Sequence, residues 1–299
     1  MIENHMPAPS IRVHTCTAAA QLLEFLSPLD QARWPDRRFI FRGQPSADFP
    51  LEASAHRLFG RITASGQFGS KDVYVHQQIS FEVFLLRSFL EGCDRSGLTV
   101  PGDGVEVRQI MEHLIPQFVL TPKHWPPQPL HQVLAVAQHH GVPTCLLDWT
   151  QRGHVAAYFA ASSALSLPIP PSHLAVWALD TYERNNWKDF GLVQLPGGTS
   201  SNLAAQRGLF TISRIRQESS DTFIPVPLNE HNPYSSGVSL IKYTLPFSEA
   251  IPLLEGCHRL GVSGSTLFPG YEGVAKEVQD LANMGKRDFD SSIISAREL

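Results

Sequence analysis

The sequence predicts a single α+β domain in which helices flank a mixed or antiparallel sheet. Runs rich in β-branched and aromatic residues, at 38–44, 174–180 and 239–245, have the composition and length of strands. The segment 71–90 repeats apolar residues every three or four positions, as a helix with one buried face does. No internal repeat or sharp change of composition divides the chain, so we expect one domain.

The amino-terminal part predicts an arm, a helix and then a strand. Residues 1–16 include two prolines and are expected to form a flexible arm. Thr17 suits the capping position of a helix over 18–26. The run 38–44 then predicts a strand that carries Arg42 and leads into a polar loop.

The middle of the chain predicts a helical insert over about residues 71–136. It leads into the helix 129–140, which has a proline in its first turn. Gly141 follows that helix and suits the left-handed position at which helices commonly end.

The residue types in 138–150 predict the end of a helix, then a turn, then a short buried strand. Its apolar run Cys145–Leu147 ends on three residues with polar groups, Asp148, Trp149 and Thr150. Buried strands that end in polar residues often carry functional sites. The alternative is a tight connection whose polar groups only cap helix ends.

The carboxyl-terminal half predicts further strands and helices. Gln206 precedes a short strand, and 239–245 alternates as a half-buried strand does. Helices are expected at 248–260 and 273–282, and the polar tail 285–299 is expected to fray.

Composition excludes several classes of function. A net charge of −4 does not indicate binding to duplex nucleic acid, but Arg37, Arg38 and Arg42 lie close together in the sequence and leave a local basic groove open. The four cysteines are isolated, without a CxxC pair, which argues against a zinc ribbon or a disulfide scaffold and favours a reducing compartment. No signal-peptide pattern or apolar run of membrane-spanning length is present. We therefore expect a cytoplasmic protein without a membrane partner.

Common catalytic signatures are missing: the phosphate loop, the dinucleotide glycine motif, the nucleophile elbow and the zinc-binding HExxH helix. His139 and His140 give a weak metal signal, because adjacent residues do not share a helix face. We expect no metal site. For Asp148 three roles stay open: a general base, an orienting group, or an acceptor for buried backbone amides.

Arg42 is the most suggestive single residue. It ends an apolar strand and is followed by Gly43, so a guanidinium fork lies beside accessible backbone. That combination suits a planar anion or a phosphate. The alternative is an arginine that pairs with an acidic residue such as Asp148 to hold the fold.

A set of motifs runs along the chain: Phe41-Arg42-Gly43-Gln44, Gln138–Thr150, Ala156–Ala160, Ala175–Leu179, Gln206–Thr211, and Leu260–Val262 with Thr266–Ala275. These motifs closely resemble the FRG domain, which is named for its Phe-Arg-Gly motif. The resemblance covers about residues 20–282, and we expect a single FRG domain over 17–284. Its departures include Cys145 where the family usually has Arg, so a charge role is not carried over to that position.

A looser resemblance links the chain to the ADP-ribosyltransferase fold. One class of that fold has an Arg ending its first strand, a second strand with Ser or Thr, and a later Glu. Arg42 and Thr150 match the first two positions, and Gln206, which is not an acid, falls near the third. Because a glutamine cannot act as a base, this difference argues against simple transfer chemistry.

These resemblances imply an NAD-dependent, ADP-ribosyltransferase-like transferase in a bacterial toxin or antiviral (anti-phage) defence setting. The expected partners are NAD as substrate and an unidentified protein or nucleic acid as acceptor. Trp149 would stack on the nicotinamide, and Asp148 would orient its neighbours. The implied catalytic residues are Arg42, His139, Thr150 and Gln206, and the implied NAD-binding residues are Arg42, Gly43, Gln44, Gln138, Asp148 and Trp149.

Two alternatives come from other classes of protein. One is a non-catalytic module that senses a nucleotide or a protein, which Gln206 in place of an acid favours. The other is a ribonuclease with His139 and His140 as acid and base, which would need a basic groove that the net charge does not indicate.

Overall fold

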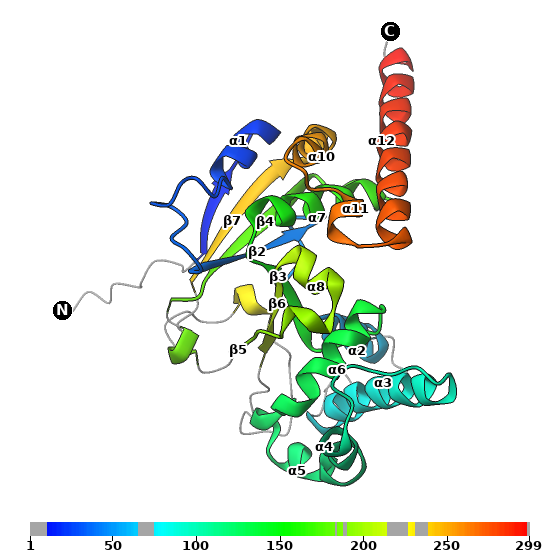
Figure 1. The fold of residues 1–299 in the computed structure, drawn as a ribbon. Helices are drawn as coiled ribbons and strands as arrows, with labels where there is room; N and C mark the ends of the chain where they lie inside the picture. The colour runs from blue at the N-terminus through cyan, green and yellow to red at the C-terminus, as the bar shows by residue number, and fades with distance from the viewer. Residues whose placement is uncertain are drawn as a thin grey trace, which may run out of the picture.

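The computed structural model describes residues 11–64, 75–182, 184–187, 190–213, 227–230 and 239–297. Within them, seven strands form one mixed sheet in the order β1-β7-β4-β2-β3-β6-β5 (Figure 1). The β1–β7 pair is parallel and the other pairs are antiparallel. The prediction of an α+β fold with a mixed sheet flanked by helices is therefore confirmed. The strands are β1 (Ile11–Thr15), β2 (Phe39–Gln44), β3 (Leu146–Thr150), β4 (His173–Asp180), β5 (Phe190–Val193), β6 (Gly208–Ser213) and β7 (Ser239–Pro246).

One face of the β1-β7-β4-β2 half of the sheet is covered by helices. Phe41, Val176 and Tyr243 of the strands share a buried core with the alanine-rich α7. A Cβ at Gly43 would lie 1.9 Å from the backbone oxygen of Ala156, so only glycine allows β2 to approach α7 this closely. The helices on this side are α1 (Ala19–Phe25), α7 (Gly153–Ser166), α10 (Ala250–Arg259), α11 (Gly264–Leu267) and α12 (Tyr271–Arg297).

The helical insert forms the end of the molecule that lies opposite α1, α10 and α12 (Figure 1). Its apolar side chains share a second buried core with Leu146 of β3 and Phe210 of β6. The described helices from residue 75 onward fall in the region of the predicted insert of about 71–136, whereas one helix of this group precedes it. Residues 71–74 lie outside the described part. Its helices are α2 (Ser54–Ala64), α3 (Val75–Arg95), α4 (Val105–Gln109), a π-helical turn (Ile110–Leu114), α5 (Ile115–Leu120) and α6 (His131–His139).

Shorter elements complete the fold between the strands. The short helix α8 (Ser201–Gln206) precedes β6 and ends on Arg207, whose φ of 45° is left-handed. Turns of 3-10 helix occur at 122–124, 128–130, 184–186, 197–199, 228–230 and 247–249. None of the described helices has both the length and the apolar character needed to span a bilayer.

Two predicted boundaries were wrong. Residues 11–15 of the expected flexible arm form β1, which pairs with β7, while residues 1–10 lie outside the described part. The expected frayed tail from 285 belongs to α12, which continues to Arg297. Polar composition does not end a helix by itself, and Lys, Arg and Glu are favourable on an exposed helix.

Candidate functional site

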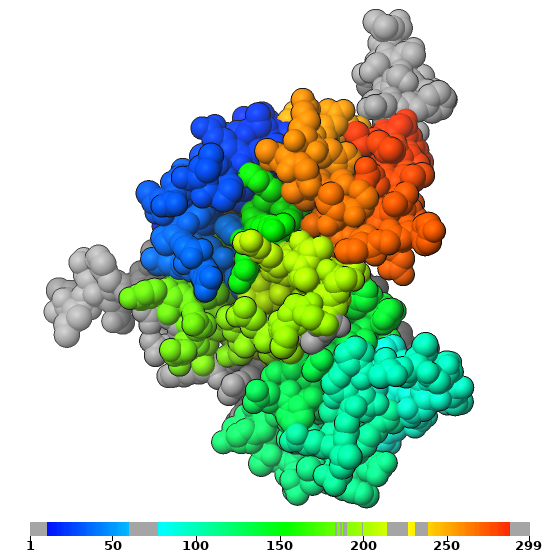
Figure 2. All heavy atoms as spheres, in the orientation of Figure 1, coloured from blue at the N-terminus to red at the C-terminus, as the bar shows by residue number. Residues whose placement is uncertain are grey.

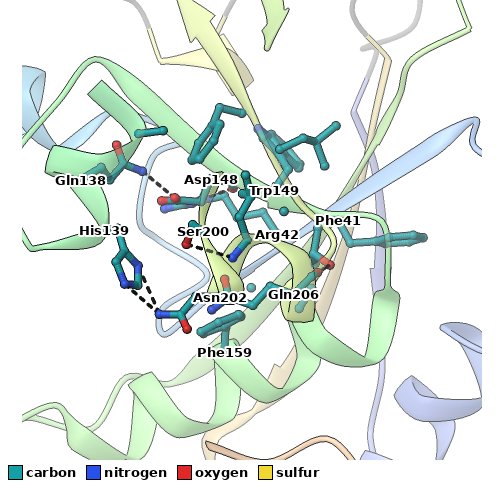
Figure 3. A pocket seen from close by; sticks show the side chains of 18 of the residues that line it. Phe41, Arg42, Gln138, His139, Asp148, Trp149, Phe159, Ser200, Asn202 and Gln206 are labelled. Carbon is teal, nitrogen blue, oxygen red and sulfur yellow. Dashed lines mark hydrogen bonds and ion pairs between the residues drawn. The ribbon is translucent and has the colours of Figure 1, made fainter. Parts of the chain in front are cut away.

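A cavity of about 420 Å³ lies where β2, β3, α6, α7 and α8 meet (Figure 3). The four residues expected to be catalytic, which come from four different elements, all line it: Arg42, His139, Thr150 and Gln206. Of the expected NAD-binding residues, Gly43, Gln138, Asp148 and Trp149 line it as well. The aromatic residues Phe159 and Phe268 also line it. A volume of this size is typical of small-molecule sites.

Arg42 lies where the sheet separates. β2 pairs with β4 along its whole length but with β3 only through Phe41 and Thr150. Arg42 Nη1 donates to the backbone oxygen of Asp148 at 2.8 Å, and lies 3.6 Å from the Asp148 carboxylate. The guanidinium therefore donates a hydrogen bond to a backbone oxygen of β3 at a position where β2 and β3 are no longer paired.

The Arg42 guanidinium still has an unused donor. Its Nε is buried and has no hydrogen-bond partner. Burial lowers the pKa of Arg42, and the neighbouring Asp148 opposes that shift, although arginine stays charged in proteins. A buried donor without a partner costs free energy, so an acceptor supplied by a ligand would be favourable here.

A chain of hydrogen bonds fixes Asp148 beside Arg42. Thr144 Oγ1 donates to Gln138 Oε1, which leaves the amide nitrogen of Gln138 to donate to Asp148 Oδ1 at 2.5 Å. The Asp148 side chain is 61% exposed. Asp148 therefore holds an orienting position, and the expected pairing of Arg42 with Asp148 is present.

His139 faces Asn202 across the cavity (Figure 3). The amide nitrogen of Asn202 lies 2.8 Å from Nε2 of the ring, a contact in which a neutral imidazole accepts. Partial burial, and secondly the nearby His140, lower the pKa of His139. Both observations favour a neutral ring at neutral pH. His140 does not line the cavity; its ring stacks 6.4 Å from that of Phe89.

Thr150 and Gln206 form one rigid corner of the cavity. The buried Thr150 hydroxyl donates to the backbone oxygen of Gln206 at 2.6 Å. The Gln206 amide nitrogen donates to the backbone oxygen of Leu267 at 3.2 Å. The hydroxyl hydrogen of Thr150 is thus used to position α8, while Gln206 Oε1 keeps acceptor capacity.

Part of the chain that forms the cavity matches a known protein family. Residues 37–167 match the family model of the FRG domain. The chain contains an FRG domain. The matched region includes β2, α6, β3 and α7, whereas Asn202, Gln206 and Phe268 of the cavity lie beyond it. No curated protein and no solved structure matches the chain.

Gln44 and Trp149, both expected to bind NAD, have their polar side-chain atoms engaged in the core of the protein. Gln44 is buried and does not line the cavity; its amide accepts from Trp177 Nε1 at 2.7 Å and donates to Pro50. Trp149 is 3% exposed, and its indole donates to Thr211 in the core on the other face of the sheet. Because side chains alternate along a strand, Trp149 points away from Asp148 and Thr150. Trp149 lines the cavity, but its indole is engaged in the core, so its stacking on nicotinamide stays a prediction.

Other residues of the cavity were not predicted from the sequence, and Asn202 is the most important of them. It is buried in the first turn of α8, where Ser200 caps the helix by accepting from the Leu203 amide. The sequence Ser200-Ser-Asn is a recognisable helix start, but nothing local places it beside His139. Among the described residues, no group of three or more His, Cys, Asp or Glu side chains is arranged to hold a metal ion.

Proposed function

We propose that the cavity of this FRG domain binds NAD and that the protein transfers its ADP-ribose to an acceptor. The observation that carries the proposal is the buried Arg42 Nε without a partner, on a residue that lines the cavity. A pyrophosphate oxygen is a suitable acceptor for this donor, because charge-assisted bonds from arginine to phosphate are strong.

The rest of the cavity suits the other parts of a dinucleotide. Phe159 and Phe268 offer apolar aromatic surface for a flat heterocycle, in addition to Trp149. The amide oxygen of Gln206 is an acceptor for a ribose hydroxyl. These contacts would place the nicotinamide–ribose bond near His139.

The chemistry requires one bond to break and one to form. The bond between C1′ of the ribose and the nicotinamide nitrogen breaks, and its electron pair leaves with nicotinamide, which needs no proton. A nucleophile on the acceptor then bonds to C1′ and loses a proton. His139, neutral because its pKa is lowered, is the proposed base for that proton.

The proposed setting follows from the resemblance to FRG domains and is a bacterial toxin or an anti-phage defence system. There, NAD consumption or modification of a target would serve as the output.

Incubation of the purified protein with adenylate-labelled NAD and cell lysate tests the proposal. We expect nicotinamide release and labelling of an acceptor, both lost in Arg42→Lys, because lysine cannot reproduce the guanidinium fork. Arg95→Lys, at an exposed position of α3, is the matched control and should behave as wild type. No NAD binding in calorimetry together with no nicotinamide release would rule the proposal out.

One observation favours a non-catalytic nucleotide sensor as the second candidate. Asp148 is the one carboxylate among the described residues that line the cavity, and Gln138 and Arg42 engage it. The residues that line the cavity thus include no free acid at the position where the ADP-ribosyltransferases that the chain loosely resembles carry glutamate. NAD binding without nicotinamide release, abolished by Arg42→Lys, would identify the sensor.

A further inference from the structure

The outward face of α12 carries a continuous apolar stripe. Its larger members are Tyr271, Val274, Val278 and Leu281, whose side chains are between 55% and 95% exposed. Ala275, Ala282 and Gly285 fill the positions between them and are also exposed. We call these seven residues the α12 stripe. At 3.6 residues per turn they occupy about one third of the helix circumference over roughly 22 Å of its length.

The opposite face of α12 is fixed to the body of the protein. Asp280 is fully buried and accepts from Tyr158 and Ser162 of α7, both at 2.6 Å. Lys276 donates to the same carboxylate at 2.6 Å. These charge-assisted bonds set the rotation of α12, so the α12 stripe faces solvent and does not turn inward. Figure 1 shows α12 along one side of the molecule, with its carboxyl-terminal half extending beyond α10, and Figure 2 shows it on the surface.

A row of polar residues borders one side of the stripe. Glu272, Gln279 and Lys286 are exposed and spaced seven residues apart, so they lie in line along the helix. The other border includes Glu277, which packs against the body by accepting from Ser263 and Ser265. Only the border formed by Glu272, Gln279 and Lys286 is therefore free to contact a second helix.

We propose that the α12 stripe is the contact surface for a second copy of this chain, in an antiparallel pair of α12 helices centred on Gln279. An antiparallel two-fold pair brings the same border of both helices together. Glu272 of one copy then lies beside Lys286 of the other, in two equivalent pairs, and Gln279 meets Gln279. The row of charges is therefore complementary to itself, as an isologous interface requires.

A parallel pair does not fit these residues. It would bring the polar row against the Glu277 border of the second copy, which packs against α11 of its own chain. In the antiparallel pair, the small Ala275, Ala282 and Gly285 provide space for Val274, Val278 and Leu281 of the other helix. The surface is small, so we expect roughly micromolar affinity.

A charge-exchange experiment tests the interface. Sedimentation velocity over a range of concentrations should show a reversible dimer of the wild-type protein. Glu272→Lys and Lys286→Glu should each weaken the dimer at least tenfold, because like charges would face each other. The double variant E272K/K286E should restore it. Thermal melts of each variant check that these exposed changes leave the fold intact.

Oxidative cross-linking tests the direction of the pair. Gln279→Cys should form a disulfide-linked dimer. Glu272→Cys should not, because in the antiparallel register the two 272 positions lie about 21 Å apart along the axis. The four native cysteines are buried and give a low background. A protein that is monomeric at every concentration, a double variant without restored affinity, or equal cross-linking at 272 and 279 would each overturn the proposal. Sedimentation and cross-linking report on the dimer alone, so their outcome does not depend on whether the protein binds NAD.

Discussion

Glu82 in the helical insert and Arg42 in the sheet are both charged side chains held inside the molecule, and their surroundings differ. Both carboxylate oxygens of Glu82 are engaged, one by Gln78 at 2.6 Å and the other by Trp125 at 2.8 Å. His56 Nε2 lies 3.2 Å from the same group. Arg42, by contrast, keeps a buried Nε without a partner.

This difference in hydrogen bonding indicates that the charge of Glu82 is structural, whereas the charge of Arg42 is available to a ligand. Burial alone would raise the pKa of Glu82, but the hydrogen bonds and charge of His56, followed by Trp125 and Gln78, lower it. Glu82 is 3% exposed, joins α3 to α2 and to the turn at Trp125, and has no contact with the cavity. Arg42 combines incomplete hydrogen bonding with a place on the cavity wall. That combination distinguishes a candidate site from a buried network.

The largest expected effect is on stability, at Glu82. Glu82→Ala removes the acceptor of two buried donors, Gln78 and Trp125, and the carboxylate beside His56, and should lower the free energy of unfolding by about 3–5 kcal/mol. Glu91→Ala, at an exposed position of the same helix, is the control and should change it by less than about 0.5 kcal/mol. Urea unfolding measures both. A loss below about 1 kcal/mol for Glu82→Ala would mean that the network is not structural.

A smaller effect, on binding and not on stability, is expected at Asp148. Because its side chain is largely exposed, Asp148→Asn should change the free energy of unfolding by at most about 1 kcal/mol. Affinity for NAD should fall about tenfold, since the carboxylate that is held by Gln138 and orients the Arg42 guanidinium is lost. Calorimetry and urea unfolding on one sample separate these effects. Asp30→Asn, in the surface pair with Arg33, is the control; a large loss of stability with unchanged affinity would contradict the comparison.

The smallest expected effect concerns protonation of His139. Since its folded-state pKa is lowered, the unfolded chain takes up the proton first as the pH falls below the ordinary histidine value of about 6.5. Its contribution to stability is therefore complete above that pH and decreases below it.

NMR titration of the His139 ring measures this shift. His140→Ala should raise the pKa of His139 part of the way towards the ordinary value, because it removes one of the two causes that lower it. His113→Ala, at an exposed position of the helical insert, should leave it unchanged. Proton uptake by His139 at the ordinary value in the wild type would remove the support for a neutral base.

Much of the site's framework could be predicted, because local signals define it. The apolar run before Arg42 forms β2, and Gly141, with φ of 84°, ends the turn after α6 as the sequence suggests. Arg42, His139, Thr150 and Gln206 each lie at or near an element end that local residue types indicate, and they line one cavity. Their catalytic roles stay predictions.

What the sequence could not supply depends on contacts between distant segments. The orientations of Gln44 and Trp149 follow from the pairing of β2 and β3 with β4 and β6, which residue types alone do not define. Asn202 reaches His139 only because α8 and α6 border the same cavity. β1 has four exposed residues of five, so it lacked the apolar alternation by which strands are recognised.

The place of β1 in the sheet affects how the chain reaches this fold. Thr15 and Thr244, which face each other across β1 and β7, are 229 positions apart. During synthesis β1 leaves the ribosome long before β7 exists, and its backbone groups have no partner in the sheet until then. Pairs of such high sequence separation form slowly, and unpaired strands in the interval favour aggregation. Completion of this edge of the sheet should therefore be a late step in folding, and expression should be sensitive to chaperones that shield the nascent amino-terminal segment.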